Sequence, residues 1–268
     1  MFRHEEADQV PIIDYPCAPT IARWRGEGLP AYADFVDFLD MDRIIEIDTD
    51  SSPRFHPRTL EQTDDYVLAT NNWGATVRAP RTGGASSIVR YGIADRDDWS
   101  MARELMTGTP DRLPWDFMYG NYGEWRRKGA WVQGNLVFGV DPLRTAALGP
   151  EGLKRAMSED PDWVSDMLNH SFDVTMDLMN IVWDAGYRYD AVAWKDDLSS
   201  EYISPEQFRA LLKPVYKRAV DWAHEKEIPI TLHAAGDLGP ILPDLVQIGL
   251  DGLHVRSVRM VGDPIELK

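Results

Sequence analysis

Residues 189–194 read Tyr-Asp-Ala-Val-Ala-Trp, residues 228–233 read Ile-Pro-Ile-Thr-Leu-His, and residues 251–255 read Asp-Gly-Leu-His-Val. These runs are short and largely apolar, which is typical of strands that are buried on both faces of a parallel sheet. Segments with helical period separate them, so that from residue 160 to 255 the order is helix, strand, helix, strand, helix, strand. This alternation predicts βα units with right-handed crossovers, and therefore an α/β fold.

The helical segments of this stretch have readable ends. Asp160, followed by a proline, has the residue types of a helix start; apolar residues then recur at three- and four-residue steps until Gly186. The stretch Ser204-Pro-Glu-Gln207 has the spacing of a capping box, and Pro214 predicts a kink in the helix that it opens. A third helix is expected from about residue 237 to 249.

Three earlier apolar runs extend the pattern towards the N-terminus. They are Val10-Pro-Ile-Ile-Asp14, Ile44-Ile-Glu-Ile-Asp48 and Ala130-Trp-Val-Gln-Gly-Asn-Leu-Val137. Together with the later runs they predict six parallel strands in one domain that covers residues 1–268.

Residues 51–129 break this rhythm and predict an insertion of hairpin and loops. Within it, Tyr66–Ala69 and Gly74–Arg78 have the character of two antiparallel strands around Asn71-Asn72. Long insertions in α/β domains often shape the binding site.

The composition excludes several classes of function. The 28 basic and 44 acidic residues give a formal charge of −16, which repels nucleic-acid backbones and anionic membrane surfaces. No apolar run reaches the roughly 18 residues that span a bilayer, and the first residues lack the pattern of a signal peptide. Cys17 is the one cysteine of the sequence, so neither an internal disulfide nor a zinc site with two thiolates is expected. We therefore expect a cytoplasmic protein that binds neither nucleic acid nor membrane.

Polar residues follow the apolar runs. The last position of a strand, or the first of the next loop, holds Asp14, Asp48, Asn135, Lys195-Asp196-Asp197, His233 and His254. In a parallel barrel the carboxyl ends of the strands meet at one rim, where active sites of this architecture lie. We therefore expect these side chains to line one pocket.

Each of these residues also has a structural interpretation. Asp14 and Asp48 could each serve only in a turn, and one of Asp196 and Asp197 is expected to make a turn hydrogen bond while the other faces the pocket. His233 could be a buried structural histidine. Arg23 could bind an anionic substrate or lie on a solvated helix, and Gly236-Asp237 could offer backbone N–H groups to a carboxylate or phosphate.

Several stretches resemble the uroporphyrinogen decarboxylase superfamily, which includes porphyrinogen decarboxylases and corrinoid-linked methyltransferases of thiols such as coenzyme M. They are Asp8-Gln-Val-Pro-Ile12, Gly134, Asp160-Pro161, Asp196-Asp-Leu198, Ser204-Pro-Glu-Gln-Phe208, Lys213-Pro214, His233-Ala-Ala-Gly-Asp-Leu238 and Leu242-Pro-Asp-Leu-Val-Gln-Ile-Gly249. The likeness is dense from 186 to 256 and thin from 50 to 130. The resemblance implies a TIM-type (β/α)8 barrel and a homodimer.

The resemblance also implies roles for single residues. Asp48 matches the aspartate that contacts the pyrrole nitrogens of the substrate in the decarboxylases. Their Arg-x-x-x-Arg pair after the first strand is absent, because Tyr15-Pro-Cys-Ala-Pro-Thr20 stands there, and their tyrosine after the third strand is not evident. The methyltransferases ligate zinc through a His-x-Cys motif and a later cysteine. Here His233 is kept, but Ala235 stands in the cysteine position.

The length differs from that of a complete barrel. Two further βα units, on the order of 60–80 residues, would be needed after the sixth run. We therefore expect an α/β barrel truncated after about six strands, the alternative being an open barrel.

The resemblance implies a uroporphyrinogen decarboxylase-like carboxy-lyase that removes carbon dioxide from a porphyrinogen-type small molecule without a cofactor. The expected catalytic residues are Asp48, Asp197 and His233, and the expected substrate-binding residues are Asp14, Asn135, Asp196, Arg23, Gly236 and Asp237. The first alternative is a methyltransferase that takes a methyl group from a corrinoid protein, with zinc or another metal held by His233 and Asp197. The second is a non-catalytic binding module.

Overall fold

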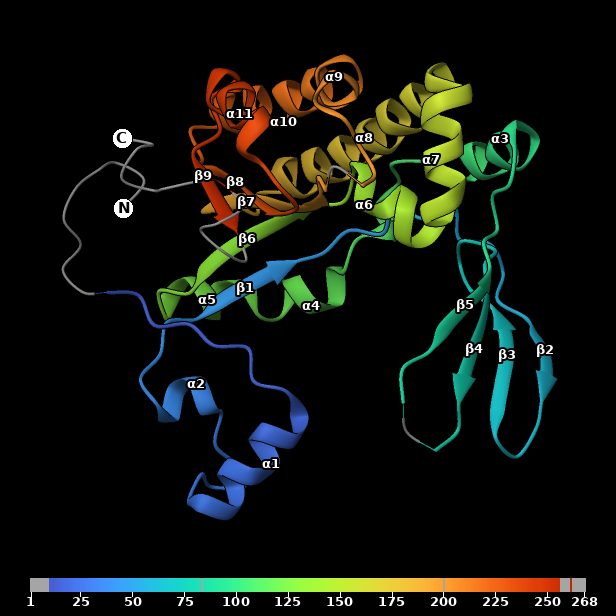
Figure 1. Cartoon of the computed structure of the whole chain (residues 1–268). Coiled ribbons are helices and arrows are strands. Elements are labelled where there is room, and N and C mark those ends of the chain that lie inside the picture. The colour runs from blue at the N-terminus through green and yellow to red at the C-terminus, as the bar shows by residue number, and fades with distance from the viewer. Residues whose placement is uncertain (1–9, 83, 200, 256–260, 262–268) are drawn as a thin grey trace.

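The computed structural model describes residues 10–82, 84–199, 201–255 and 261. A parallel sheet of five strands forms its centre (Figure 1). The strands follow the order β1 (Ile44–Ile47), β6 (Trp131–Leu136), β7 (Ala191–Asp197), β8 (Ile230–Ala235) and β9 (Gly252–Val255). Consecutive strands of the chain lie side by side in one direction, as the alternation of helices and strands predicts.

One of the six expected strands is absent. The prediction for Val10–Asp14 is wrong, because these residues form neither helix nor strand. Pro11 has no N–H to donate to a ladder, and the side chain of Val10 is 82% exposed, so this apolar run has no buried face. Its backbone is instead fixed at Ile12, which exchanges hydrogen bonds with Asp42. Asp14 consequently does not stand at the end of a strand.

Helices cover one face of the parallel sheet. The longest is α8 (Pro161–Asp184), and the Asp160 side chain caps it by accepting a hydrogen bond from Trp163 N, as the sequence predicts. The preceding α7 (Gly149–Glu159) packs against α8. A Cβ on Gly134 of β6 would lie only 2.4 Å from the terminal carbon of Met179, so α8 comes close to the sheet here and a larger residue would displace the end of that side chain.

The helical segment after β7 contains the expected capping box and an irregular turn. The segment consists of α9 (Pro205–Gln207), the π-helical turn η3 (Phe208–Leu212) and α10 (Lys213–Glu225). The π-helical turn ends two residues before Pro214. A wider turn relieves the clash between a proline ring and the carbonyl four residues earlier, and it takes the place of the expected kink. The third predicted helix is present as the 3₁₀ turn η4 (Gly239–Ile241) and α11 (Leu242–Ile248), which ends at left-handed Gly249.

Residues 51–129 contain a second, antiparallel sheet. The expected hairpin is present as β3 (Tyr66–Thr70) and β4 (Thr76–Pro80), flanked by β2 (Thr59–Gln62) and β5 (Ser87–Arg90). This sheet projects from one end of the molecule, away from the parallel sheet (Figure 1). The insertion continues through α3 (Arg96–Leu105), η1 (Pro110–Arg112), α4 (Trp115–Tyr119) and α5 (Tyr122–Arg127).

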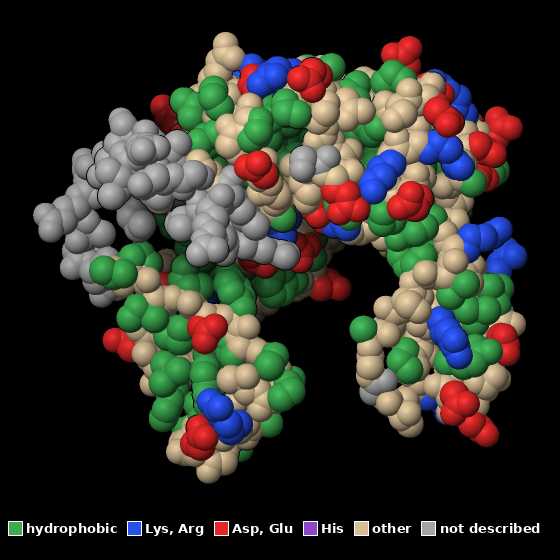
Figure 2. Space-filling model, in the orientation of Figure 1, with side chains coloured by type: hydrophobic (Ala, Val, Ile, Leu, Met, Phe, Trp, Pro, Cys, Tyr) green, Lys and Arg blue, Asp and Glu red, His purple; other side chains and the backbone are tan. Residues whose placement is uncertain are grey.

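A second projection is formed by α1 (Ala18–Glu27) and α2 (Phe35–Phe38), neither of which has a buried residue. Hydrophobic side chains gather on its surface (Figure 2). The core lies instead between the parallel sheet and its helices, where the rings of Phe138, Trp194 and Tyr216 are in mutual contact with centroids 5.1–5.9 Å apart.

The five parallel strands do not close on themselves within the described residues. The β1 strand pairs there with β6 alone, and β9 with β8 alone. The fold is therefore α/β with a parallel sheet, and closure into a barrel stays a prediction. Among the described helices, none has both the length and the apolar character needed to cross a membrane.

Candidate active site

The register of the parallel sheet decides which predicted residues share a face. Asn135 pairs with Ala193, Lys195 pairs with His233, and His233 pairs with His254. Because side chains alternate along a strand, Asn135, Lys195, Asp197 and His233 all belong to one face. Asp196 belongs to the opposite face, which the helices cover. We call the first of these the polar face; it carries Glu46, Asp48, Gln133, Asn135, Lys195, Asp197, His233 and His254.

Asp48 lies at one side of the polar face, directly after β1. Its Oδ1 accepts a hydrogen bond of 2.7 Å from Nδ2 of Asn135, and the amide oxygen of Asn135 accepts one of 3.1 Å from Gln133. Asp48 is exposed. The amide of Asn135 orients one carboxylate oxygen, and among the described residues no hydrogen bond to the other oxygen is seen.

A row of cationic and imidazole groups lies on the neighbouring strands. Lys195 of β7 stands beside His233 of β8, and the ring of His233 stacks on that of His254 with centroids 4.1 Å apart. Lys195 and His254 are exposed and His233 is half-buried. Such a row can hold the carboxylate of a substrate or donate a proton to it.

Asp197 is held at the end of β7 by two neighbours. Its Oδ1 accepts hydrogen bonds from the backbone and the hydroxyl of Ser199, which is the turn chemistry expected of one residue of this pair. Its Oδ2 lies 3.3 Å from Nη2 of Arg144, and the same nitrogen lies 2.5 Å from Oδ1 of Asp141. Both oxygens of Asp197 therefore have partners, and the guanidinium of Arg144 is shared by two carboxylates.

Asp196 is buried on the other side of the strand. Its carboxylate accepts hydrogen bonds from the backbone N–H of Val140, from that of Asp141 and from the hydroxyl of Tyr216, at 3.0, 2.6 and 2.5 Å. With 3% of its surface exposed, it holds the loop after β6 against β7 and α10. Burial raises the pKa of Asp196 to about 7, although these hydrogen bonds favour the charged form.

The loop after β8 holds the predicted residues Gly236 and Asp237. Gly236 has φ of +103°, and a Cβ there would lie 2.4 Å from the backbone nitrogen of Ser199. Asp237 is exposed and accepts a hydrogen bond from the backbone of Gly239. The glycine therefore lets two loops of the rim touch, because both its conformation and its lack of a side chain are needed.

We expect Gly236→Ala to lower the free energy of unfolding by about 2–4 kcal/mol, since it combines a disfavoured backbone conformation with a clash against a neighbouring backbone. Gly120→Ala is the matched control, because a Cβ there meets nothing within 4 Å. Urea unfolding of both variants measures the difference. Equal stability of the two would contradict the proposed contact between the loops.

Two predicted residues are not on the strands of the parallel sheet. Asp14 is exposed and its Oδ1 accepts a hydrogen bond from the next backbone nitrogen, which is turn chemistry. Arg23 lies on α1, where its side chain is 67% exposed and pairs with Glu27 one turn later. The solvated-helix interpretation of Arg23 is the one that these contacts fit.

A pocket that the sequence did not reveal lies at the carboxyl ends of β1 and β6. Its volume is about 300 Å³, and its walls come from residues 49–52, from Asn72 and Trp73 at a turn of the second sheet, and from residues between 137 and 146. No sequence motif indicates this pocket, because the three segments that form its walls are far apart in the sequence.

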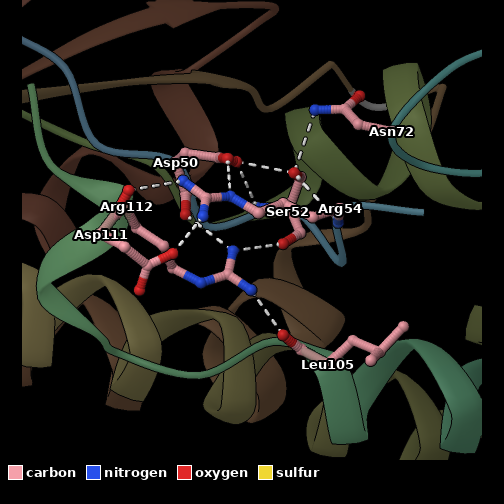
Figure 3. A network of polar contacts seen from close by, with 7 residues as sticks. All are labelled: Asp50, Ser52, Arg54, Asn72, Leu105, Asp111 and Arg112. Carbon is pink, nitrogen blue, oxygen red and sulfur yellow. Dashed lines mark hydrogen bonds and ion pairs between the residues drawn. The ribbon is translucent and has the colours of Figure 1, made fainter. Parts of the chain in front are cut away.

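The loop that forms one wall of this pocket is fixed by two arginines (Figure 3). Arg112, which is 6% exposed, donates to the backbone oxygens of Asp50, Ser52 and Leu105 at 3.1, 2.6 and 2.5 Å. Arg54 bonds the carboxylates of Asp50 and Asp111 at 2.6 and 2.5 Å. Burial works against the charged form of Asp50, but hydrogen bonds from Ser52 and Arg54 outweigh it and lower its pKa.

The donor set does not fit a zinc site with thiolates. Ala235 stands where a cysteine would be needed, and Cys17 is exposed near the start of α1. Among the residues with described positions, no three His, Cys, Asp or Glu side chains come together as metal ligands. His233 and Asp197 are the pair expected as metal ligands. Asp197 is not available as a ligand in this arrangement, because Ser199 and Arg144 engage both of its oxygens.

The fold and the site define an α/β protein with a parallel sheet and a polar site near the carboxyl ends of its strands. Residues 144–261 match the family model described as uroporphyrinogen decarboxylase (URO-D). The resemblance to the uroporphyrinogen decarboxylase superfamily that the sequence motifs predict is thereby confirmed for these residues.

A solved structure, a methyltransferase from Methanosarcina mazei, is similar to the chain with a TM-score of 0.50 and 18% sequence identity. The match covers 71% of this chain and 57% of that one, so the chain spans little more than half the length of the methyltransferase. At this identity the match shows the fold. A search of curated proteins gave no match.

Proposed function

We propose that the chain is a uroporphyrinogen decarboxylase-like enzyme that removes carbon dioxide from a porphyrinogen-type polycarboxylate on the polar face, without a metal or an organic cofactor. The observation that carries the proposal is the shared face of Asp48, Lys195 and His233, which joins a carboxylate to a row of groups that bind anions. We further propose that the five strands are part of a TIM-type barrel.

The spacing of these groups supports a large substrate. Asp48 and His233 are three strand positions apart in the sheet order, which corresponds to about 14 Å measured along the sheet. A ring-sized molecule with several carboxylates can span such a separation, and this favours a porphyrinogen-type substrate.

In this mechanism Asp48 stabilises positive charge. Protonation of the substrate ring creates a cation, the bond to the carboxylate carbon breaks with its electrons returning to the ring, and carbon dioxide leaves. A proton from the site then replaces it on carbon. Asp48, held by Asn135, faces the cation, while Lys195 and His233 hold a further substrate carboxylate or transfer the proton.

We expect Asp48→Asn to lower the rate of decarboxylation by about 10²–10³-fold, because an amide keeps the hydrogen bond to Asn135 but carries no charge. The assay incubates the full chain with uroporphyrinogen under reducing, anaerobic conditions and measures released carbon dioxide and products with fewer carboxylates. Asp116→Asn, at an exposed position of α4, is the matched control. An Asp48→Asn variant as active as that control contradicts the assigned role.

The alternative is methyl transfer from a corrinoid protein to a small acceptor, and its support is the methyltransferase fold of the similar structure. It is tested by incubating the chain with methylcobalamin and a thiol, with and without zinc. Methyl transfer without decarboxylation favours this alternative. Failure of both assays, with Asp48→Asn and His233→Ala leaving ligand binding unchanged, favours a non-catalytic binding module. The homodimer and the cytoplasmic location stay predictions.

A further inference from the structure

The amide group of Asn135 lies between two other polar side chains of the polar face. Its nitrogen Nδ2 donates to Oδ1 of Asp48 at 2.7 Å, and its oxygen Oδ1 accepts from Nε2 of Gln133 at 3.1 Å. These three side chains therefore form one hydrogen-bonded chain, which links β6 to the end of β1. We call this chain the amide relay.

The strands bring the members of the amide relay together. Gln133 and Asn135 are two residues apart in β6, so their side chains belong to the same face of the sheet. The pairing of Ile47 with Gly134 places Asp48 beside Asn135. Both amide side chains are half-buried, whereas Asp48 is exposed. An exposed carboxylate without a partner exchanges between rotamers, so a hydrogen bond from a half-buried amide restricts it.

The direction of the hydrogen bonds in the amide relay is fixed by Asp48. A carboxylate only accepts hydrogen bonds, so the part of the Asn135 amide that faces it has to be the N–H. The carbonyl oxygen of Asn135 then points to position 133, where a donor is needed. Glutamine supplies this donor, whereas an apolar side chain or a carboxylate at position 133 does not.

Within the described residues, the amide relay is the restraint on the Asp48 side chain. No hydrogen bond from these residues reaches Oδ2 of Asp48, and the carbonyl oxygen of Asn135 is held by Gln133. Without the donor of Gln133 the amide of Asn135 is free to turn over, and Asp48 then loses the N–H that orients it.

We propose that Gln133 is a positioning residue, which sets the orientation of the Asp48 carboxylate through Asn135. This role rests on the proposed function, in which Asp48 faces the cation formed on the substrate. Asn135 consequently acts on Asp48 rather than as the substrate-binding residue expected from the sequence. Stabilisation of a developing charge depends steeply on where the opposite charge lies, so loss of the relay slows the reaction and leaves substrate binding nearly unchanged.

The substitution Gln133→Glu tests the role, because it keeps the size of the side chain but replaces its donor by an acceptor. Asn135 then has an acceptor on both sides, and its carbonyl oxygen has to face one of them. We expect kcat for the decarboxylation of uroporphyrinogen to fall about 10- to 100-fold, with KM within about threefold of the parent value. We expect Gln133→Met, which adds no charge, to lower kcat roughly 3- to 10-fold. Gln62→Glu, at an exposed position of β2, is the matched control for the added charge.

The double variant Asp48→Asn, Gln133→Glu separates positioning from a general disturbance of the sheet. In it the amide of Asn135 can turn over, donate to position 133 and accept from position 48, so the relay is restored in the opposite direction. We expect Gln133→Glu alone to lower the melting temperature by about 2–4 °C and the double variant to regain most of that loss. The added carboxylate lies beside Glu46 in both variants, so repulsion between these two groups does not account for the recovery.

Two further comparisons use the same set of variants. In an Asn135→Leu background the recovery of melting temperature should disappear, because positions 48 and 133 are linked through the amide of Asn135. In the Asp48→Asn background Gln133→Glu should lower kcat no further, because the carboxylate that the relay positions is already gone.

The proposal is overturned if Gln133→Glu is as active as Gln62→Glu, if KM changes in place of kcat, or if the recovery is missing or persists without Asn135. A parent chain that releases no carbon dioxide overturns the proposed decarboxylase function instead. The melting temperatures then test the amide relay without an activity assay, so the two failures are distinguishable.

Discussion

Arg112→Met is expected to lower the free energy of unfolding by about 3–5 kcal/mol. The guanidinium is buried and donates to three backbone oxygens, those of Asp50, Ser52 and Leu105. Methionine fills much of the same volume but donates no hydrogen bond, so these oxygens lose their partner in a place that water does not easily reach. The loop that lines the pocket should loosen at the same time.

Arg54→Met is the matched control within the same network. The side chain of Arg54 is 37% exposed, and its carboxylate partners can turn to water when it is lost. We expect a loss of at most about 1 kcal/mol. Urea unfolding of both variants at one pH measures the contrast. Similar losses of unfolding free energy for the two variants would contradict the expectation that the burial of Arg112 makes its hydrogen bonds more stabilising than those of Arg54.

The stability of the protein is expected to fall as pH rises from about 4 to about 7, through the ionisation of Asp196. Burial raises the pKa of this carboxyl from an ordinary value of 3.8 to about 7. An acid whose pKa is raised by folding holds its proton more tightly in the folded state, so its contribution is full below the unfolded pKa and is lost as pH rises to the folded pKa. The loss is up to about 4 kcal/mol and ends above pH 7.

The variant Asp196→Asn isolates this contribution. Its side chain cannot ionise, and its amide oxygen can take the place of Oδ2 and accept from Val140 N–H and the Tyr216 hydroxyl. Its amide nitrogen then stands in the place of Oδ1, so the hydrogen bond from Asp141 N–H is lost at every pH. The free energy of unfolding of parent and variant is measured in urea from pH 5 to 8.5. We expect the parent to lose stability relative to the variant as pH rises. A difference that is constant with pH, or that moves the other way, contradicts a raised pKa.

The sequence predicts the parallel sheet well, because buried strands and capped helices leave local signals. The β7 and β8 strands and α8 follow from apolar runs and from Asp160. The strand expected at Val10–Asp14 shows the limit of that signal, since an apolar run becomes a strand only where a partner and a buried face exist. The strands β2 and β5 were missed for the opposite reason: they are exposed and show no buried alternation.

The candidate site was predictable as a set of residues but not as an arrangement. Asp196 and Asp197 are neighbours in sequence, and only the register of β7 places one in the core and the other at the rim. The pocket was beyond sequence analysis, because Arg112 reaches Ser52 across 60 positions and no periodicity marks such a contact.

The second sheet reaches the pocket through the Asn72–Trp73 turn, and the rest of it projects away from the body of the molecule. Substitutions at that turn would therefore change one wall of the pocket and leave the residues of the parallel strands as they are. The hairpin could be exchanged as a unit, and relatives with other residues at this turn would be expected to differ in the lining of the pocket more than in the polar face.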